Sequence, residues 1–205
     1  MMKRIGAVTT VSKALLLSAL VLLAVSGGCR LFEPREPEPP TQSSGNFVPP
    51  TLPEIVISNL QNAIAEKNLE NYMSCFADPT RSSHVFSFNP AASFTTLRSP
   101  WAYSDERNHF QELITQGLPA GFSSLILRLK FSSISSDSVI YSYDYTFTFE
   151  TKPENTFPST ASGNLQFTLG LESNNWWVIY YWKDNDDPNT PGITWSAFKG
   201  KFSRE

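Results

Sequence analysis

The chain has 205 residues, of which 40% are hydrophobic, 13% aromatic and 17% charged, and its net charge is −3. This composition is typical of a globular protein and excludes a coiled coil, a collagen and a wholly disordered chain. With a pI near 5.5, the chain offers no basic surface to a phosphate backbone, so nucleic acid is not expected as a partner.

The first 28 residues have the pattern of a lipoprotein signal peptide. Three cations, Lys3, Arg4 and Lys13, have no accompanying acid, and a mainly apolar run at 14–25 leads to two glycines and Cys29. As a helix this run rises only about 18 Å, too little for a hydrocarbon core of roughly 30 Å. The end of the segment resembles the bacterial lipobox, which implies cleavage before Cys29 and a diacylglycerol on its thiol. An ordinary secretory signal is the alternative.

The residue after the cysteine predicts in which membrane the lipid anchor lies. Arg30 stands where enterobacterial sorting places an Asp to retain lipoproteins at the inner membrane. By resemblance to that rule, we expect an outer-membrane anchor with the chain facing the periplasm. Lipidation of Cys29 would leave Cys75 without a disulfide partner, and its apolar helical surroundings predict a buried, inert thiol.

Residues 29–53 are predicted to be a tether. They hold seven of the fifteen prolines together with acidic and small polar residues. Proline removes backbone donors, and such a composition buries almost nothing, so an extended spacer is expected. One folded domain is expected at 54–205.

The folded part is predicted to begin with helices. Apolar residues recur at helical spacing from Pro53 to Ile64 and again over 69–76. A third helix is expected from the N-cap Ser104, with acids in its first turn, to Gly117.

After residue 120, apolar residues no longer recur at helical spacing but at every second position, as in a strand. Alternation predicts strands at 125–131, 139–149 and 164–171, and the segment 176–182 is apolar on both faces, as in an interior strand. A short strand at 85–88 precedes them. Helices first and consecutive strands afterwards predict an α+β fold, in which a curved antiparallel sheet wraps around three N-terminal helices.

This element order resembles the cone-shaped α+β barrel of the nuclear transport factor two-like superfamily, also called SnoaL-like. The resemblance covers roughly residues 54–202, and it is carried by the segments 59–64, 71–78, 85–88 and 176–182. The ending at 193–202 is similar to that of small bacterial lipoproteins of this type.

The superfamily contains ketosteroid isomerases, dehydratases and epoxide hydrolases as well as non-catalytic domains, so function depends on the site rather than the fold. An isomerase needs an Asp base and an oxyanion hole formed by Tyr and a protonated Asp. No residues here align with that pattern, because strand alternation separates Asp144 from Tyr143 and Tyr145. No catalytic residue is therefore assigned.

Aromatic side chains supply the candidate binding site. They can either fill the concave face of the sheet or leave an apolar pocket for a small ligand, and both interpretations remain open. The candidate lining residues are Tyr141, Tyr143, Tyr145, Phe147, Trp177 and Tyr181. The opposite face is polar and poor in charge, which permits a homodimer of the kind that superfamily relatives form.

Candidate catalytic and metal-binding residues are few. Asp78, His84 and His109 could provide acid and base groups at the mouth of a cone, although solvated or capping roles explain them as well. Three acids, Asp184, Asp186 and Asp187, share a loop, but the Gly and Glu of a calcium-binding EF-hand loop are missing. No metal or cofactor is expected.

Three hypotheses about function follow. The leading one is a membrane-tethered envelope lipoprotein that acts as a non-catalytic binding or assembly module for an apolar small ligand or a protein partner. The alternatives are a pocket enzyme of isomerase or hydrolase type that uses Asp78, His84 or His109, and a purely structural envelope protein. A fully packed cone would favour the last.

Overall fold

The computed structural model describes residues 45–94, 96–97, 100–187 and 192–203. The predicted signal peptide, the predicted lipidation site Cys29 and the predicted tether up to residue 44 lie outside the described residues. Within the described part of the chain, no helix combines the length and the apolar character needed to cross a membrane.

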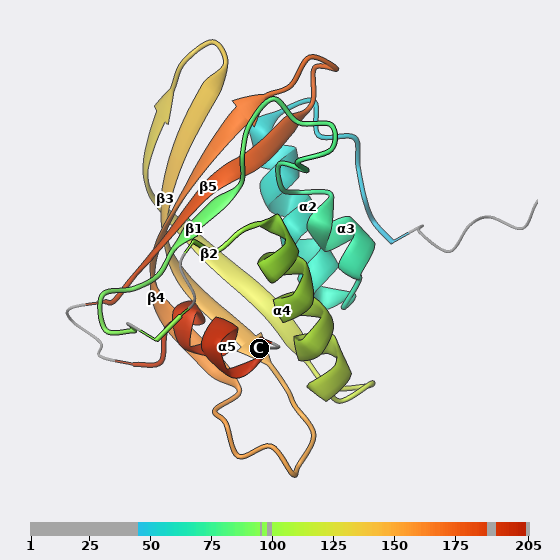
Figure 1. The fold of residues 1–205 in the computed structure, drawn as a ribbon, viewed down its shortest axis with the longest axis vertical. Coiled ribbons are helices and arrows are strands. Elements are labelled where there is room, and N and C mark those ends of the chain that lie inside the picture. The colour runs from blue at the N-terminus through green and yellow to red at the C-terminus, as the bar shows by residue number, and fades with distance from the viewer. Residues whose placement is uncertain (1–44, 95, 98–99, 188–191, 204–205) are drawn as a thin grey trace, which may run out of the picture. The chain divides into compact units, whose positions relative to one another are not determined.

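A curved five-stranded sheet forms one layer of the domain (Figure 1). Its strands are β1 (Ser87–Asn89), β2 (Ser123–Ile134), β3 (Ser138–Phe149), β4 (Thr160–Leu171) and β5 (Trp177–Asn185), in the order β1-β5-β4-β3-β2. Neighbouring strands from β2 to β5 are antiparallel, as expected. The sheet is nevertheless mixed, because β1 pairs with β5 in parallel, with Phe88 opposite Trp182. This pairing makes β5 an interior strand, as its two apolar faces predicted.

The predicted helices are α2 (Pro53–Ala65), α3 (Leu69–Met73) and α4 (Tyr103–Gln116). They lie together on one side of the curved sheet (Figure 1). Helix α4 begins one residue before the predicted cap at Ser104, because the carboxylate of Asp105 accepts a hydrogen bond from the Ala102 amide at 2.8 Å. A C-terminal helix that the sequence analysis did not predict, α5 (Trp195–Lys201), lies against β4 and near α4.

The core lies between the helices and the concave face of the sheet. Every second residue of β3 is buried, from Val139 to Phe149, as its alternation predicted. Buried apolar residues of α2 and Trp182 of β5 belong to the same continuous cluster. A fully buried large apolar side chain contributes about 1.5–3 kcal/mol, so this cluster accounts for much of the driving force of folding.

The last part of the predicted tether is fixed to the domain. The backbone of Val48 exchanges two hydrogen bonds with the side chain of Asn59 on α2, at 3.0 and 2.7 Å. The Pro50 carbonyl accepts a hydrogen bond from the Trp177 amide at 2.8 Å. Contacts with the domain therefore begin several residues before the predicted boundary at Pro53.

Candidate functional site

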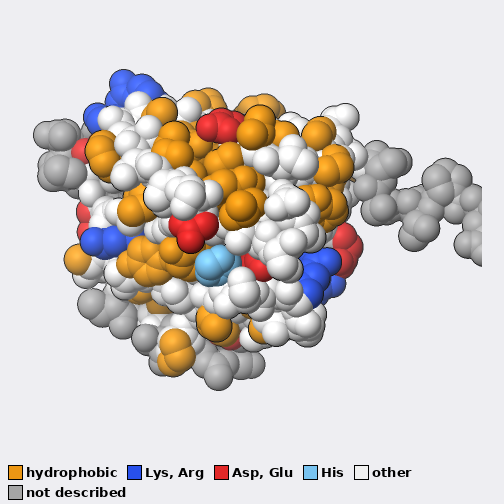
Figure 2. All heavy atoms as spheres, turned by 90° about the horizontal axis from the view of Figure 1, so that it is seen from above, with side chains coloured by type: hydrophobic (Ala, Val, Ile, Leu, Met, Phe, Trp, Pro, Cys, Tyr) orange, Lys and Arg blue, Asp and Glu red, His pale blue; other side chains and the backbone are white. Residues whose placement is uncertain are grey.

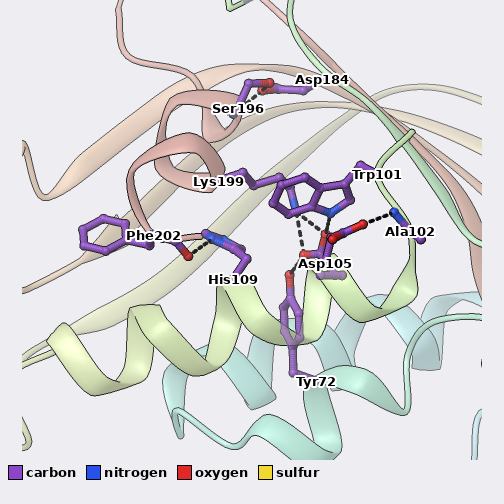
Figure 3. Close-up of polar contacts among 10 residues, drawn as sticks. Tyr72, Trp101, Ala102, Asp105, His109, Asp184, Ser196, Lys199 and Phe202 are labelled. Atoms are coloured by element: carbon purple, nitrogen blue, oxygen red, sulfur yellow. Dashed lines mark hydrogen bonds and ion pairs between the residues drawn. The ribbon is translucent and has the colours of Figure 1, made fainter. Parts of the chain in front are cut away.

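The main polar cluster inside the domain surrounds Glu106 of α4, which is completely buried. Its carboxylate accepts hydrogen bonds from the Tyr72 hydroxyl at 2.7 Å and from Nε1 of Trp101 at 2.8 Å. The Lys199 ammonium of α5 donates to both carboxylate oxygens, to Oε1 at 2.5 Å. Figure 3 shows these side chains converging from α3, from α5 and from the segment before α4. Each donor comes from a different part of the chain, so the folded topology is required to assemble the cluster.

Aromatic rings enclose the ammonium group of Lys199, whose side chain has no exposed surface. Its Nζ lies 4.0 Å from the ring centroid of Trp182, 4.5 Å from that of Phe88 and 5.4 Å from that of Trp101. Such ring faces attract a cation, and the attraction is larger when the cation is desolvated. The side chain therefore lies in an aromatic cage closed by one carboxylate.

Burial and charge pairing act against each other in this cluster. Burial lowers the pKa of Lys199 to about 8, although the neighbouring carboxylate opposes the change. For Glu106, burial raises the pKa, but the Lys199 charge and the hydrogen bonds outweigh it and leave the pKa below its usual value. At neutral pH both groups are therefore charged and neutralise each other.

His109 lies one turn further along α4 and is also fully buried. Its Nδ1 is 3.1 Å from the Phe202 carbonyl, so Nδ1 carries the proton and donates it. Burial and the nearby Lys199 charge lower the pKa of His109 to about 3. The ring is therefore neutral at physiological pH, and its Nε2 has no hydrogen-bond partner among the described residues.

A second buried cluster fixes the start of α5 to the sheet. Asp184 of β5 accepts hydrogen bonds from the Ser196 amide at 2.7 Å and from the Ser196 hydroxyl at 2.5 Å. The Tyr145 hydroxyl of β3 donates to Asp184 at 2.9 Å and accepts from the Trp195 amide at 2.7 Å. Asp184, one of the three acids that the sequence placed in a loop, is therefore buried beside the start of α5. Asp186 instead binds the Ser93 backbone and side chain at the surface.

The concave face of the sheet is covered by α5 and its flanking aromatic residues. Trp195 stacks on Phe147 with ring centroids 4.2 Å apart, and Phe198 packs edge-on against the same ring at 5.1 Å. Both side chains are fully buried. The chain's own C-terminal segment therefore occupies the space in front of β3.

The structure places five of the six candidate lining residues on the concave face. Tyr141, Tyr143, Tyr145, Phe147 and Trp177 are all buried. Tyr181 was expected with them but is only half-buried and faces the other way. The register of β5 against β4 shifts between Ile179 and Tyr181, so that Trp182, not Tyr181, points into the core. This β-bulge breaks the alternation on which the expectation rested.

The three candidate acid and base groups are not brought together. Asp78 caps a surface turn by accepting hydrogen bonds from Thr80, while His84 stacks on Tyr180 with ring centroids 4.6 Å apart. His109 lies inside the domain. Among the hydrogen bonds of the described residues, none joins two of these three groups. No set of three or more His, Cys, Asp or Glu in that part of the chain is arranged to hold a metal ion.

Hollows are present outside the cone. One of about 300 Å³ lies beside the β4–β5 turn, at the end of the domain that Figure 2 shows, where apolar and acidic side chains lie side by side. It is lined by Ser74, Phe76, Asp78, Arg81, Ser82, Glu172, Ser173, Asn174, Trp176 and Val178. Another of about 260 Å³ lies beside the C-terminal end of α4 and contains Glu112 and Lys201. Both are open to solvent and neither reaches the Glu106 cluster.

Comparison with known proteins gives structural but not sequence matches. No protein-family model and no curated protein match the sequence. A Novosphingobium aromaticivorans protein, provisionally named an aromatic ring hydroxylase, matches with a TM-score of 0.51 and 12% identity over 71% of this chain and 92% of its own. A conserved Planctomyces limnophilus protein matches with 0.51 and 7% identity, over 64% and 91%. A nuclear transport factor 2 (NTF2-like) superfamily protein from Salmonella enterica matches with 0.49 and 13% identity, over 67% and 89%.

The order of elements along the chain agrees with the expectation from the sequence. Two helices, a short strand, a third helix and a four-stranded meander follow one another along the chain, as the sequence resemblance implied. The domain has an α+β fold with a curved mixed sheet, and the Novosphingobium and Planctomyces proteins resemble it at TM-scores of 0.51. At these identities the likeness concerns the fold alone, and the chemistry of this cone depends on its own side chains.

Sequence reasoning missed the two residues at the centre of the cone. Glu106 was interpreted only as an acid in the first turn of a helix, and Lys199 was not singled out. A signal was present, because Trp195, Phe198 and Phe202 recur at helical spacing and indicate a buried helix face. The neighbouring lysine could have been identified as a buried charge only with knowledge of its partner.

Proposed function

We propose that this chain is a non-catalytic binding module, held in the cell envelope by a lipid on Cys29. The filling of the cone by α5 argues against a substrate or ligand inside it and is shared with a purely structural protein, so the observation that carries the proposal is the hollow beside the β4–β5 turn. Residues 195–202 cover the concave face with buried aromatic side chains, and the ionisable Glu106 and Lys199 are paired with each other. An enzyme of this fold would need such groups free to meet a substrate in an open pocket.

Binding is then expected at the outside of the cone. The hollow beside the β4–β5 turn combines the charged side chains of Asp78, Arg81 and Glu172 with the partly exposed ring of Trp176. Polar groups around one exposed aromatic side chain suit a polar partner surface. This lining favours a protein partner over an apolar ligand inside the cone.

The N-terminal segment supports a membrane-bound location. In the proposal, residues 29–45 connect the lipid to the domain, and the attachment of Val48 and Pro50 fixes the domain end of the tether beside α2 and β5. We propose an outer-membrane anchor with the domain in the periplasm. Self-association through the outer face of the sheet stays a prediction, which sedimentation of the purified domain tests.

The lipid anchor is tested by comparing the full chain with its Cys29→Ser variant in a bacterial host. The wild type is expected in the detergent phase after Triton X-114 partition, with a mass that includes diacylglycerol. C29S is expected in the aqueous phase or uncleaved in the inner membrane. A wild type that partitions with water and carries an unmodified thiol would contradict the anchor.

The binding surface is tested by photo-cross-linking in intact cells. A benzoylphenylalanine at position 176 lies in the hollow, and the same residue at position 122 is an exposed aromatic control at the opposite end of the β-sheet. The proposal expects a defined cross-linked protein from position 176 and none of that mass from position 122. Identical patterns from both positions, or no product from either, would contradict a partner at the hollow.

A further inference from the structure

The carboxylate of Glu106 is held in place independently of Lys199. Tyr72 and Trp101 each donate a hydrogen bond to it, one to each oxygen, and both donors are buried. We therefore expect the carboxylate to keep its orientation when the lysine side chain is removed. A preoriented anion with its lone pairs directed to one point is an acceptor for a cationic donor.

The walls around that point suit an organic cation. The rings of Trp182, Phe88 and Trp101 surround Nζ at 4.0 to 5.4 Å, and they belong to β5, β1 and the segment before α4. Only the ammonium group and its carbon chain come from α5. The carboxylate and the three rings around it are therefore all supplied by parts of the chain other than the helix that carries Lys199.

Helix α5 has other attachments that do not depend on the lysine. Ser196 binds Asp184, Trp195 stacks on Phe147, and the Phe202 carbonyl accepts from His109. Removal of the Lys199 side chain is therefore expected to empty the cage while α5 stays in place.

We propose that Glu106 and the rings around it form a binding site for a primary alkylammonium ion, and that the folded chain fills this site with its own Lys199 side chain. In the wild type the site is occupied by a covalently attached ligand. A free ligand of matching size binds when that attachment is removed.

The length of the free ligand is set by the atoms that the Lys199→Ala substitution removes. Lys199→Ala removes Cγ, Cδ, Cε and Nζ, and n-propylammonium contains the same heavy atoms in the same order. The free cation can therefore restore the hydrogen bonds to Glu106 and the contacts with the rings.

The test measures the melting temperature of Lys199→Ala with increasing n-propylammonium chloride. Sodium chloride at equal ionic strength and n-propanol are the solution controls, and the wild type and Glu106→Gln/Lys199→Ala are the protein controls. We expect a saturable rise for K199A, on the order of 3 °C at ten times the Kd, and no saturable rise for either protein control. Equal effects on all three proteins, or an equal effect of n-propanol on K199A, would overturn the proposal.

Two additions keep the test decisive. If K199A does not fold alone, the readout becomes the folded fraction recovered by refolding in n-propylammonium or in n-propanol, and recovery only with the cation supports the site. Tetramethylammonium has the charge but no N–H donor, so it is expected to stabilise K199A less than n-propylammonium does. Equal stabilisation by both would overturn the assignment to primary ammonium ions.

Discussion

At the scale of single residues, the pair of Glu106 and Lys199 dominates the interior. Two charges without exposed surface neutralise each other, and the remaining lone pairs of the carboxylate accept from Tyr72 and Trp101. Such a pair adds little net stability compared with well-packed apolar residues, but the loss of one partner leaves a buried unpaired charge. The pair therefore penalises any state in which α5 leaves the cone.

The first prediction concerns that penalty. Lys199→Met keeps an unbranched side chain that is one heavy atom shorter but removes its charge, and is expected to lower the free energy of unfolding by about 3–5 kcal/mol. The control is Arg128→Met, which breaks the exposed pair with Asp144 and should cost about 1 kcal/mol or less. Urea denaturation measures both. Similar losses in the two variants would show that the Glu106 charge is not buried.

The second prediction concerns acid. The pKa of His109 is about 3 in the folded chain because of burial and the Lys199 charge, whereas the ordinary value of 6.5 applies after unfolding. Between these values the unfolded chain binds the extra proton, so stability falls as the pH falls below 6.5. At pH 5 the loss from this group is about 2 kcal/mol relative to pH 8.

The matched variant for this prediction is His109→Asn, whose amide can replace the Nδ1 donor to Phe202. Urea denaturation from pH 8 to pH 5 should show a shallower loss for H109N than for the wild type. A loss for H109N as steep as that of the wild type would contradict a neutral buried ring.

At the scale of elements, the sequence predicted those parts whose pattern is local. The alternation from Val139 to Phe149 identified β3 and its buried face, and helical spacing identified α2 and α4. Two features depend on distant partners and were not predicted. The parallel pairing of β1 is formed with β5, and the bulge near Tyr180 appears only in the register with β4.

The same distinction applies to the site. The buried positions of Tyr141 to Phe147 follow from the two-residue period of the strand, but the hydrogen-bond partners of the tyrosine hydroxyls among them do not. Tyr145 donates to Asp184, an acid that the sequence suggested only as a weak calcium ligand. Lys199 and Glu106 are separated by most of the domain in sequence, and no local pattern connects them.

The third prediction concerns helix α5. Phe198→Ala leaves a cavity beside Phe147 in the filled cone and should lower the free energy of unfolding by about 3–5 kcal/mol. Phe131→Ala makes the same substitution at a side chain that is 58% exposed. It should change the free energy of unfolding by about 0.5 kcal/mol or less. Equal effects would mean that α5 contributes little to the core.

At the scale of the whole molecule, the cone is closed by its own helix α5. The helices cover one side of the sheet, and α5 with its aromatic residues occupies the concave face that would otherwise be available to a ligand. The proposed surfaces for partners are therefore the outer hollows and the outer face of the sheet. The fold supplies a rigid, filled body, and the N-terminal segment supplies its proposed attachment to a membrane.

The most direct test of this account is native-state hydrogen exchange of the α5 amides. Ser196 donates to buried Asp184, and the Phe202 amide donates to the Phe198 carbonyl. If α5 is an integral part of the core, these amides exchange only through global unfolding, with the same opening free energy as the amides of Tyr143 and other residues in β3. Exchange of α5 at an opening free energy well below that of β3 would show a mobile lid over a usable pocket, and would contradict the account.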